Sequence, residues 1–327
     1  MNIRHKLAAC VTLATALTAF ADIKVNDALT LSGYAAGSYR ITDPDPGPAT
    51  DKFDIDAVKT LFQMNYKPVT GVISLYYVPD AVHDATVLDA YATVDIGGGS
   101  TISAGKFLSP LGYESFHIDG MTQISYANGD FLAPIPGYHT GVKWDYSDKE
   151  TGFGLALVDS IYSGPYYLKG DGELKHNAGF EGYFVYKAIP DVTVWAGFAY
   201  ETKGNVIHKN DEILTLDLWA SYNLTKDSTL ALEYVYKDGG LGDKGYNWLA
   251  FYSYNFTPKV MGVFRLSGEK MKSDRGFTKF TVSPTYKVND NFLVRAEVSY
   301  YDYTKYSVGG TKVDSAIFFG VQSVFKF

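Results

Sequence analysis

Residues 211–222 read DEILTLDLWASY, and residues 229–237 read TLALEYVYK. In the first stretch every even position from 214 to 222 is apolar or aromatic, whereas Asp217 lies at an odd position. In the second stretch the Leu and Tyr residues at even positions 230–236 alternate with Ala231, Glu233, Val235 and Lys237. Residues 292–301, FLVRAEVSYY, repeat the pattern. Successive side chains of a β-strand point to opposite faces, so each stretch predicts a strand with one apolar and one charged face.

The links between such stretches alternate in length. Short, turn-rich links occur at 67–68, 97–99, 147–150, 189–191, 225–228, 257–259 and 289–291. Longer links lie between them, at 42–52, 79–84, 108–136, 163–174, 203–210, 238–244, 269–275 and 304–312. Short periplasmic turns that alternate with long external loops are typical of a transmembrane up-and-down β-barrel. The runs between the links predict about sixteen antiparallel strands, an even number as in bacterial single-chain barrels.

The third long link, 108–136, is the longest of the set. Long irregular links in compact folds are usually functional. We expect this external loop to fold into the lumen and to narrow it. The predicted fold is therefore all-β, a single barrel domain with an inward third loop.

The N-terminus has the features of a secretory signal peptide. Arg4 and Lys6 precede the apolar or small residues 7–21, which end in Ala19-Phe20-Ala21. This pattern predicts export through the Sec pathway, cleavage after residue 21 and a mature barrel domain of residues 22–327. A lipoprotein signal is the alternative, because residues 7–10 resemble a lipobox. In a lipoprotein, however, the apolar stretch precedes the cysteine, and here it follows Cys10.

The composition suits a membrane barrel better than a secreted soluble domain. Cys10 is the only cysteine, so the mature chain has no disulfide. Mean hydropathy is −0.09, with 27 Tyr and 20 Phe, as expected when alternate residues face lipid and water. Loss of Arg4 and Lys6 changes the net charge from −7 to −9, which argues against nucleic-acid binding. A soluble propeller would show a repeat of about 40 residues, which is absent.

The C-terminal strand carries a separate signal. Phe325 and Phe327 share a face with other apolar residues, and the sequence given ends at Phe327. This resembles the terminal strand that the barrel assembly machinery reads in outer-membrane barrels. We therefore expect the protein in the cell outer membrane of a Gram-negative bacterium. The acidic, Pro-rich residues 43–46 hint at divalent-ion bridging to lipopolysaccharide, although their Pro content more simply indicates a stiff exposed loop.

Residues 105–143 carry a family resemblance. Gly105-Lys106-Phe107, then Ser109-Pro110-Leu111-Gly112-Tyr113-Glu114, and later Tyr138-His139-Thr140-Gly141-Val142-Lys143, resemble the OmpL-like putative β-barrel porins. The resemblance implies an outer-membrane pore for passive diffusion of small polar solutes and ions. It leaves the choice between a monomer and a homotrimer open. The alternative function is a plugged outer-membrane barrel with an enzymatic or structural, adhesive role.

Charge on the alternating face identifies the expected lumen wall, because charge facing lipid at mid-depth costs about 2–4 kcal/mol. This face comprises Lys59, Asp89, Asp95, Lys106, Lys143, Glu181, Asp217, Glu233, Arg265, Lys279, Arg295 and Glu297. We expect the basic candidates to oppose acidic groups of the inward loop across a narrow pore. The constriction candidates are Lys59, Lys106, Lys143, Arg265 and Arg295 on the wall, and Glu114, Asp119 and Asp130 on the loop. The alternative is that these charges pair along the wall and merely keep it wet.

Aromatic residues cluster in and around the third loop. They are Phe107, Tyr113, Phe116, Tyr126, Phe131 and Tyr138. We expect them to pin the loop to the wall through large buried apolar areas, rather than to form a sugar-stacking track.

Signals for catalysis or cofactors are thin. The histidines form no HExxH or i, i+4 pair, and no GxSxG elbow occurs. His117 with Glu114 and Asp119 lacks the spacing of a metal site. The sequence therefore predicts no enzyme, no cofactor and no metal.

Overall fold

The computed structural model describes residues 22–79, 85–127, 131–162, 174, 177–203, 212–239 and 244–327. All regular elements in these ranges are β-strands. No helix in this part of the chain is long and apolar enough to cross a membrane. The expected signal peptide, residues 1–21, lies outside the described residues.

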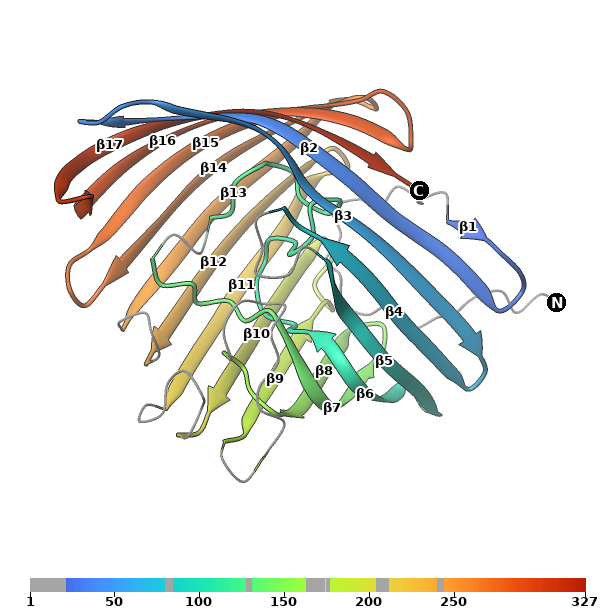
Figure 1. Cartoon of the computed structure of the whole chain (residues 1–327). Helices are drawn as coiled ribbons and strands as arrows, with labels where there is room; N and C mark the ends of the chain where they lie inside the picture. The colour runs from blue at the N-terminus through green and yellow to red at the C-terminus, as the bar shows by residue number, and fades with distance from the viewer. Residues whose placement is uncertain are drawn as a thin grey trace.

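The strands follow one another along the chain (Figure 1). They are β1 (Ile23–Lys24), β2 (Leu29–Asp45), β3 (Thr50–Tyr66), β4 (Val69–Tyr77), β5 (Ala85–Gly97), β6 (Ser100–Leu108), β7 (Tyr138–Ser147), β8 (Thr151–Val158), β9 (Gly179–Tyr186), β10 (Val192–Glu201), β11 (Ile213–Thr225), β12 (Ser228–Asp238), β13 (Gly245–Thr257), β14 (Val260–Met271), β15 (Gly276–Lys287), β16 (Phe292–Val308) and β17 (Thr311–Lys326).

Sixteen of these strands form a closed antiparallel barrel. From β2 to β17 each strand pairs with the next, and β17 pairs with β2 to close the ring. The two-residue β1 pairs with β2 beside the ring. The expected barrel and its strand number are therefore confirmed.

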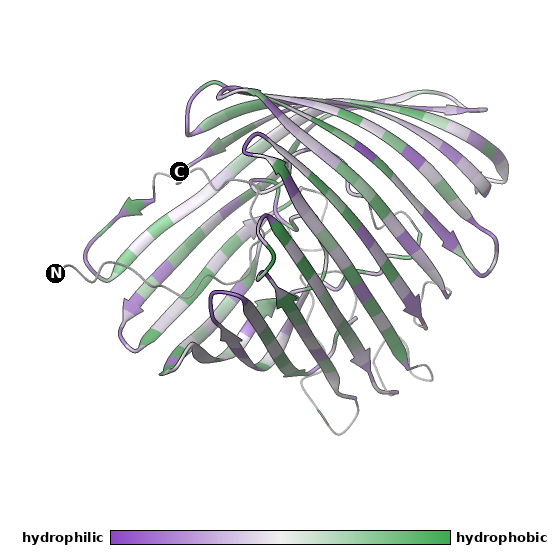
Figure 2. Cartoon of the chain, turned by 180° about the vertical axis from the view of Figure 1, so that it is seen from behind, coloured by the Kyte–Doolittle hydropathy of each residue, from purple (hydrophilic) through white to green (hydrophobic). Residues whose placement is uncertain are grey.

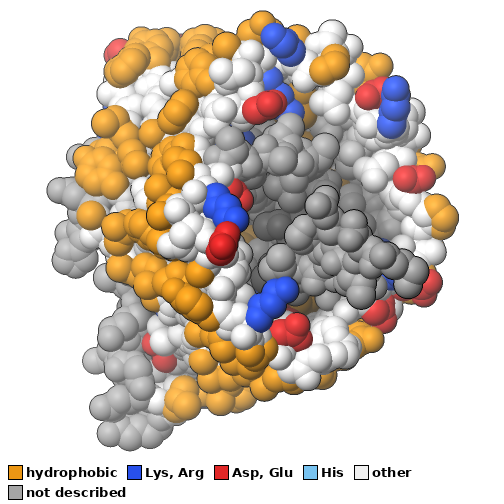
Figure 3. All heavy atoms as spheres, turned by 90° about the vertical axis from the view of Figure 1, so that its right-hand side faces the viewer, with side chains coloured by type: hydrophobic (Ala, Val, Ile, Leu, Met, Phe, Trp, Pro, Cys, Tyr) orange, Lys and Arg blue, Asp and Glu red, His pale blue; other side chains and the backbone are white. Residues whose placement is uncertain are grey.

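The two faces of the sheet differ as the alternation predicts. On β11, Leu216 and Leu218 are about half exposed, whereas Asp217 between them is 2% exposed. Hydrophilic and hydrophobic positions alternate along the strands (Figure 2). Apolar side chains gather on the outer flank, and Lys, Arg, Asp and Glu are spaced around the end that faces the viewer (Figure 3). The apolar face is therefore the outward one, and buried polar side chains line the inside.

The short links match the sequence expectation, but two long links do not. β2 continues to Asp45 and β3 begins at Thr50, so most of the expected link 42–52 is strand. β16 and β17 likewise extend to residues 308 and 311, within the expected link 304–312. The residues that extend these strands are mostly exposed. Strand pairing needs no apolar side chains outside the lipid, so these hairpins extend without the alternation that identifies a membrane strand.

Candidate pore constriction

The described residues between β6 and β7, 109–127 and 131–137, contact the inward face of the barrel wall. At the root of this segment the Ser109 amide donates to the Gly137 carbonyl at 2.9 Å. The Ser109 hydroxyl donates to Oε1 of Glu181 on β9 at 2.7 Å. The two ends of the segment are therefore joined to each other and to the wall. We call residues 109–127 and 131–137 the wall segment.

Acidic wall side chains accept hydrogen bonds from backbone amides of the wall segment. The pairs are Gly112 N to Asp217 Oδ2 at 2.7 Å, Tyr113 N to Glu233 Oε1 at 2.5 Å, Ile124 N and Ser125 N to Glu297 Oε2 at 2.6 and 2.9 Å, and Leu132 N to Glu269 Oε1 at 2.7 Å. These carboxylates come from β11, β12, β14 and β16. Hydrogen bonds to ionised acceptors are about twice as strong as neutral ones, so each strand holds the segment firmly.

Basic wall side chains bind its carbonyl groups. Arg295 on β16 donates from Nη1 to the carbonyls of Met121 and Gln123 at 2.6 and 3.0 Å, and from Nη2 to the Ile118 carbonyl at 3.0 Å. Lys279 on β15 donates to the Tyr126 carbonyl at 2.5 Å. Both cations are buried and bonded to the backbone of the wall segment.

Arg265 combines backbone and ionic contacts. Its Nη1 donates to Oε1 of Glu114 and to the Ser125 carbonyl, at 2.6 and 2.7 Å. Glu114 also accepts from the Gln123 side chain and the Ala127 amide. Among the expected pairs of an acidic loop group and a basic wall group, Glu114 with Arg265 is one that the structure brings together.

Aromatic side chains pack the wall segment against the wall. The Tyr113 ring lies 5.6 Å from the rings of both Trp219 and Phe251. Phe131 contacts Phe277 at 5.9 Å and the Arg275 guanidinium at 3.8 Å. The remaining aromatic candidates make contacts of their own. Phe107 is buried beside His139, Phe116 packs on Tyr138, and the Tyr126 hydroxyl donates to the Phe116 carbonyl. These contacts support the pinning interpretation.

His117 of the wall segment lies in a polar network with β3, β5 and β7. Its Nε2 is 2.8 Å from Lys59 Nζ and 2.7 Å from the Tyr138 hydroxyl. Lys59 also pairs with Asp89 Oδ2 at 3.0 Å. Burial, and then the Lys59 charge, hold the His117 pKa well below its usual value. A neutral ring with Nε2 as acceptor fits the Lys59 donor.

The register of β6 does not support the expected inward position of Lys106. Ser103 and Phe107 are buried on the inward face, so Lys106 shares the outward parity of Ile102. Lys106 Nζ donates to the Val87 carbonyl at 2.8 Å. Its Nζ also lies 6.0 Å from the centroid of the Tyr138 ring, so charge alone does not identify the inward face at this strand end.

The other candidates lie in different surroundings. Lys143 faces inward and pairs with Asp145 on its own strand at 3.1 Å. The Asp119 carbonyl accepts from Lys326 Nζ. Asp130 lies outside the described residues. The expected wall residues did not include Lys237 and Glu269, although both bind the wall segment. Lys237 lies on the same face of β12 as Glu233, and Glu269 lies on the same face of β14 as Arg265. Extending the inward face to the end of each strand therefore identifies both residues.

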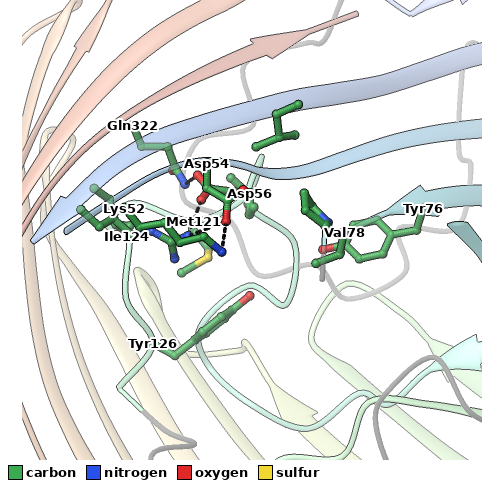
Figure 4. A pocket seen from close by; sticks show the side chains of 13 residues that line it. Lys52, Asp54, Asp56, Tyr76, Val78, Met121, Ile124, Tyr126 and Gln322 are labelled. Carbon is green, nitrogen blue, oxygen red and sulfur yellow. Dashed lines mark hydrogen bonds and ion pairs between the residues drawn. The ribbon is translucent and has the colours of Figure 1, made fainter. Parts of the chain in front are cut away.

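A cavity of about 370 Å³ lies between the wall segment and β2, β3 and β4 (Figure 4). Its lining comprises Arg40, Lys52, Asp54, Ile55, Asp56, Tyr76, Val78, Pro79, Ile118, Met121, Ile124, Tyr126 and Gln322. Sequence reasoning missed the charged members of this lining.

A β-bulge turns the cavity carboxylates inward. Ala57 pairs with Ala36, but the next pair joins Ile55 to Gly37, so Asp56 is the extra residue. Beyond the bulge, Asp54 pairs with the inward Ser38, and Ile55 becomes an exposed outward residue. Bulges commonly re-aim side chains in this way. The described residues contain no cluster of His, Cys, Asp and Glu able to hold a metal ion.

The chain matches the protein family described as putative beta-barrel porin-2, OmpL-like, over residues 28–327. No curated protein sequence matches it. Three solved structures share its fold. OprB of Pseudomonas putida gives a TM-score of 0.71 at 11% identity, covering 92% of this chain and 94% of that one. The outer membrane channel DcaP of Acinetobacter baumannii gives a TM-score of 0.65 at 8% sequence identity, covering 91% of this chain and 97% of that one. The trimer form of OmpT of Vibrio cholerae gives a TM-score of 0.61 at 15% sequence identity, covering 92% of this chain and 100% of that one.

Proposed function

The chain belongs to the OmpL-like β-barrel porins, and from this premise we propose that small polar solutes and ions cross its barrel beside the wall segment, along β2, β3 and β4. Family and fold assign the protein to the channels of the outer membrane. The proposal adds the route and the constriction.

The position of the cavity carries this proposal. Charged side chains of β9, β11, β12 and β14–β16 are bonded to the wall segment. The cavity lies instead against β2–β4 and has a charged lining. A polar space beside a pinned loop is the expected form of a size-limiting diffusion path.

Thiol labelling tests the route, because Cys10 is the only cysteine and lies in the expected signal peptide. We expect a bulky cationic thiol reagent to reduce the single-channel conductance of Asp54→Cys. The matched control is Phe53→Cys, because Phe53 is adjacent on β3 but outward and 83% exposed. Unchanged conductance in labelled Asp54→Cys, with labelling verified by mass, contradicts the route.

The alternative is a barrel plugged by the wall segment. The number of bonds between the segment and the wall favours it, because a firmly held loop can also close a lumen. A plugged barrel predicts that inserted wild-type protein carries no current. Recording the wild type before any labelling therefore separates a wrong route from a closed barrel.

We also propose that residues 1–21 direct Sec export and are removed. N-terminal sequencing of protein from outer membranes is expected to begin at Asp22. A chain that still begins at Met1 contradicts the proposal.

Assembly through the C-terminal strand is a further part of the proposal. Phe327 exchanges two backbone hydrogen bonds with Gly33 of β2, at 2.7 and 3.0 Å, where the ring closes. Phe327→Ala is expected to lower the fraction of heat-modifiable barrel in outer membranes, through weaker recognition by the barrel assembly machinery. An equal loss for purified chains refolded in detergent would instead assign Phe327 a role in barrel stability alone.

The assembled pore is proposed to be a homotrimer among lipid and lipopolysaccharide. The likeness to the trimer form of OmpT supports three copies. Mass measurement of the detergent-solubilised protein by light scattering is expected to give three chains, and one chain contradicts this part.

A further inference from the structure

The cavity beside the wall segment has one polar wall. Asp56 accepts from the Ser38 hydroxyl at 2.7 Å and from the Gln322 amide at 2.6 Å, and it pairs with Arg40 Nη2 at 3.2 Å. Lys52 pairs with Asp54 at 2.6 Å. The Asp56 side chain is 6% exposed and is held on three sides. This wall is therefore a preformed array of planar polar groups.

Some hydrogen-bonding capacity on this wall faces the cavity. The Arg40 side chain is 36% exposed and the Asp54 side chain 17% exposed. Both ion pairs of Arg40 use Nη2, although a guanidinium carries five donors. A solute hydroxyl in the cavity can therefore accept from Arg40 and donate to Asp54.

Apolar and aromatic side chains also line the cavity. They are Ile118, Met121, Ile124 and Tyr126. The Tyr126 ring lies across from Asp56 (Figure 4), and the residue is 41% exposed. An aromatic ring across from polar side chains suits a solute ring with C–H faces and a hydroxyl edge.

The charges that line the cavity balance. Arg40 and Lys52 are basic, and Asp54 and Asp56 are acidic. Because the two signs cancel, the lining has no net charge that favours a solute anion or a solute cation, whereas neutral hydroxyls both donate and accept. The volume, about 370 Å³, lies in the range of small-molecule pockets.

Resting on the proposed function, we propose that this cavity is a binding site for a neutral polyhydroxylated ring of monosaccharide size. Its edge hydroxyls bond Arg40 and Asp54, and its C–H face packs on Tyr126. The site makes the pore a facilitated path for such solutes rather than a plain sieve.

Current block in a planar bilayer tests the proposal with three solutes of one size. D-glucose is neutral, gluconate is an anion and glucosamine is a cation. We expect D-glucose to reduce the wild-type current with saturation, at a half-blocking concentration at least about tenfold below that of either charged analogue. A poly(ethylene glycol) of matched size is expected to lower the current without saturation, because it lacks hydroxyl edges.

Variants connect the block to the cavity. Tyr126→Leu and Arg40→Leu are each expected to raise the half-blocking glucose concentration about tenfold. Phe53→Leu, outside the cavity on the outward face of β3, is expected to leave it unchanged. Heat-modifiable migration of each variant on a gel verifies that the barrel is folded.

Each outcome decides a different claim. A wild-type protein that conducts but shows no saturable glucose block overturns this inference and leaves the porin role intact. Tighter block by gluconate or glucosamine overturns the neutral class. Absence of any current from inserted protein overturns the proposed function itself.

Discussion

Arg265 and Arg295 are buried inside the barrel, at 0% and 1% exposure. Burial of a charge is costly unless it is paired and hydrogen-bonded. Both guanidinium groups meet this condition through carbonyls of the wall segment. The charges therefore hold a loop backbone instead of facing an open lumen, which replaces the expected transverse field with a structural role at these positions.

Arg265 and Glu114 form a buried ion pair whose loss has a testable cost. We expect Arg265→Met to weaken docking of the wall segment by about 3–5 kcal/mol, because Glu114 stays buried without its cation. The change is read as larger current noise in single-channel records. Lys270→Met on the same strand is the control, because Lys270 is exposed and its ion pair contributes little.

The double variant Arg265→Met/Glu114→Gln distinguishes pairing from packing. It removes the uncompensated carboxylate, so we expect quieter current than in Arg265→Met alone. Equal noise in both variants would mean that the Glu114 charge has no part in docking.

His117 makes docking of the wall segment dependent on pH. The docked ring has a pKa well below 6.5, and a released ring has an ordinary pKa near 6.5. The released state thus binds the proton more readily, and docking weakens as pH falls below about 6.5. The groups that face His117 are Lys59, Tyr34, Tyr76 and Tyr138, with Asp89 behind Lys59.

The expected result is more frequent current transitions at pH 5 than at pH 7.5. His117→Gln keeps an amide in place of the ring and cannot be protonated in this range, so it is expected to lose this difference. An undiminished pH response in His117→Gln would assign the effect to titratable groups other than His117.

At the scale of the element, the bulge in β3 decides what the cavity contains. If residues 53–59 alternated without a bulge, the parity that turns Ala57 and Lys59 inward would turn Ile55 and Phe53 inward as well. Deletion of the extra residue Asp56 is expected to remove the bulge and to keep the faces of residues 50–55, because Ile55 then directly precedes Ala57 in regular alternation. Conductance is therefore expected to respond still to a label on Asp54→Cys and not to one on Phe53→Cys.

The barrel should tolerate this deletion, because the strand pairs on both sides of the bulge stay the same. Heat-modifiable migration verifies folding. A conductance response to the label on Phe53→Cys in the deletion variant would contradict this account of the register.

Strand parity predicts a face from sequence wherever the register is unbroken, as on β11, β12 and β16. It fails at Asp56, because a bulge leaves no mark in the hydrophobic pattern. It also fails at Lys106, where Phe107 rather than the charge marks the inward face. The contact of Gly112 with Asp217 joins residues 105 positions apart, so alternation alone could not predict it.

On the scale of the whole molecule, ring closure and the wall segment depend on each other. The segment is bonded to strands on both sides of the β17–β2 closure, through Arg295 on β16 and Lys59 on β3. The segment thereby bridges the two ends of the chain and leaves the cavity beside them. The fold class and strand number were accessible from periodicity and link length, whereas the position of the cavity beside the ring closure depends on the closed barrel.

The central claim is that an aqueous path passes beside the wall segment. Single-channel recording of the purified mature protein in a planar bilayer tests it most directly. Discrete, stable conductance steps are the predicted result. Silence from protein shown to be inserted and folded would contradict the claim, and the barrel would then be a plugged one.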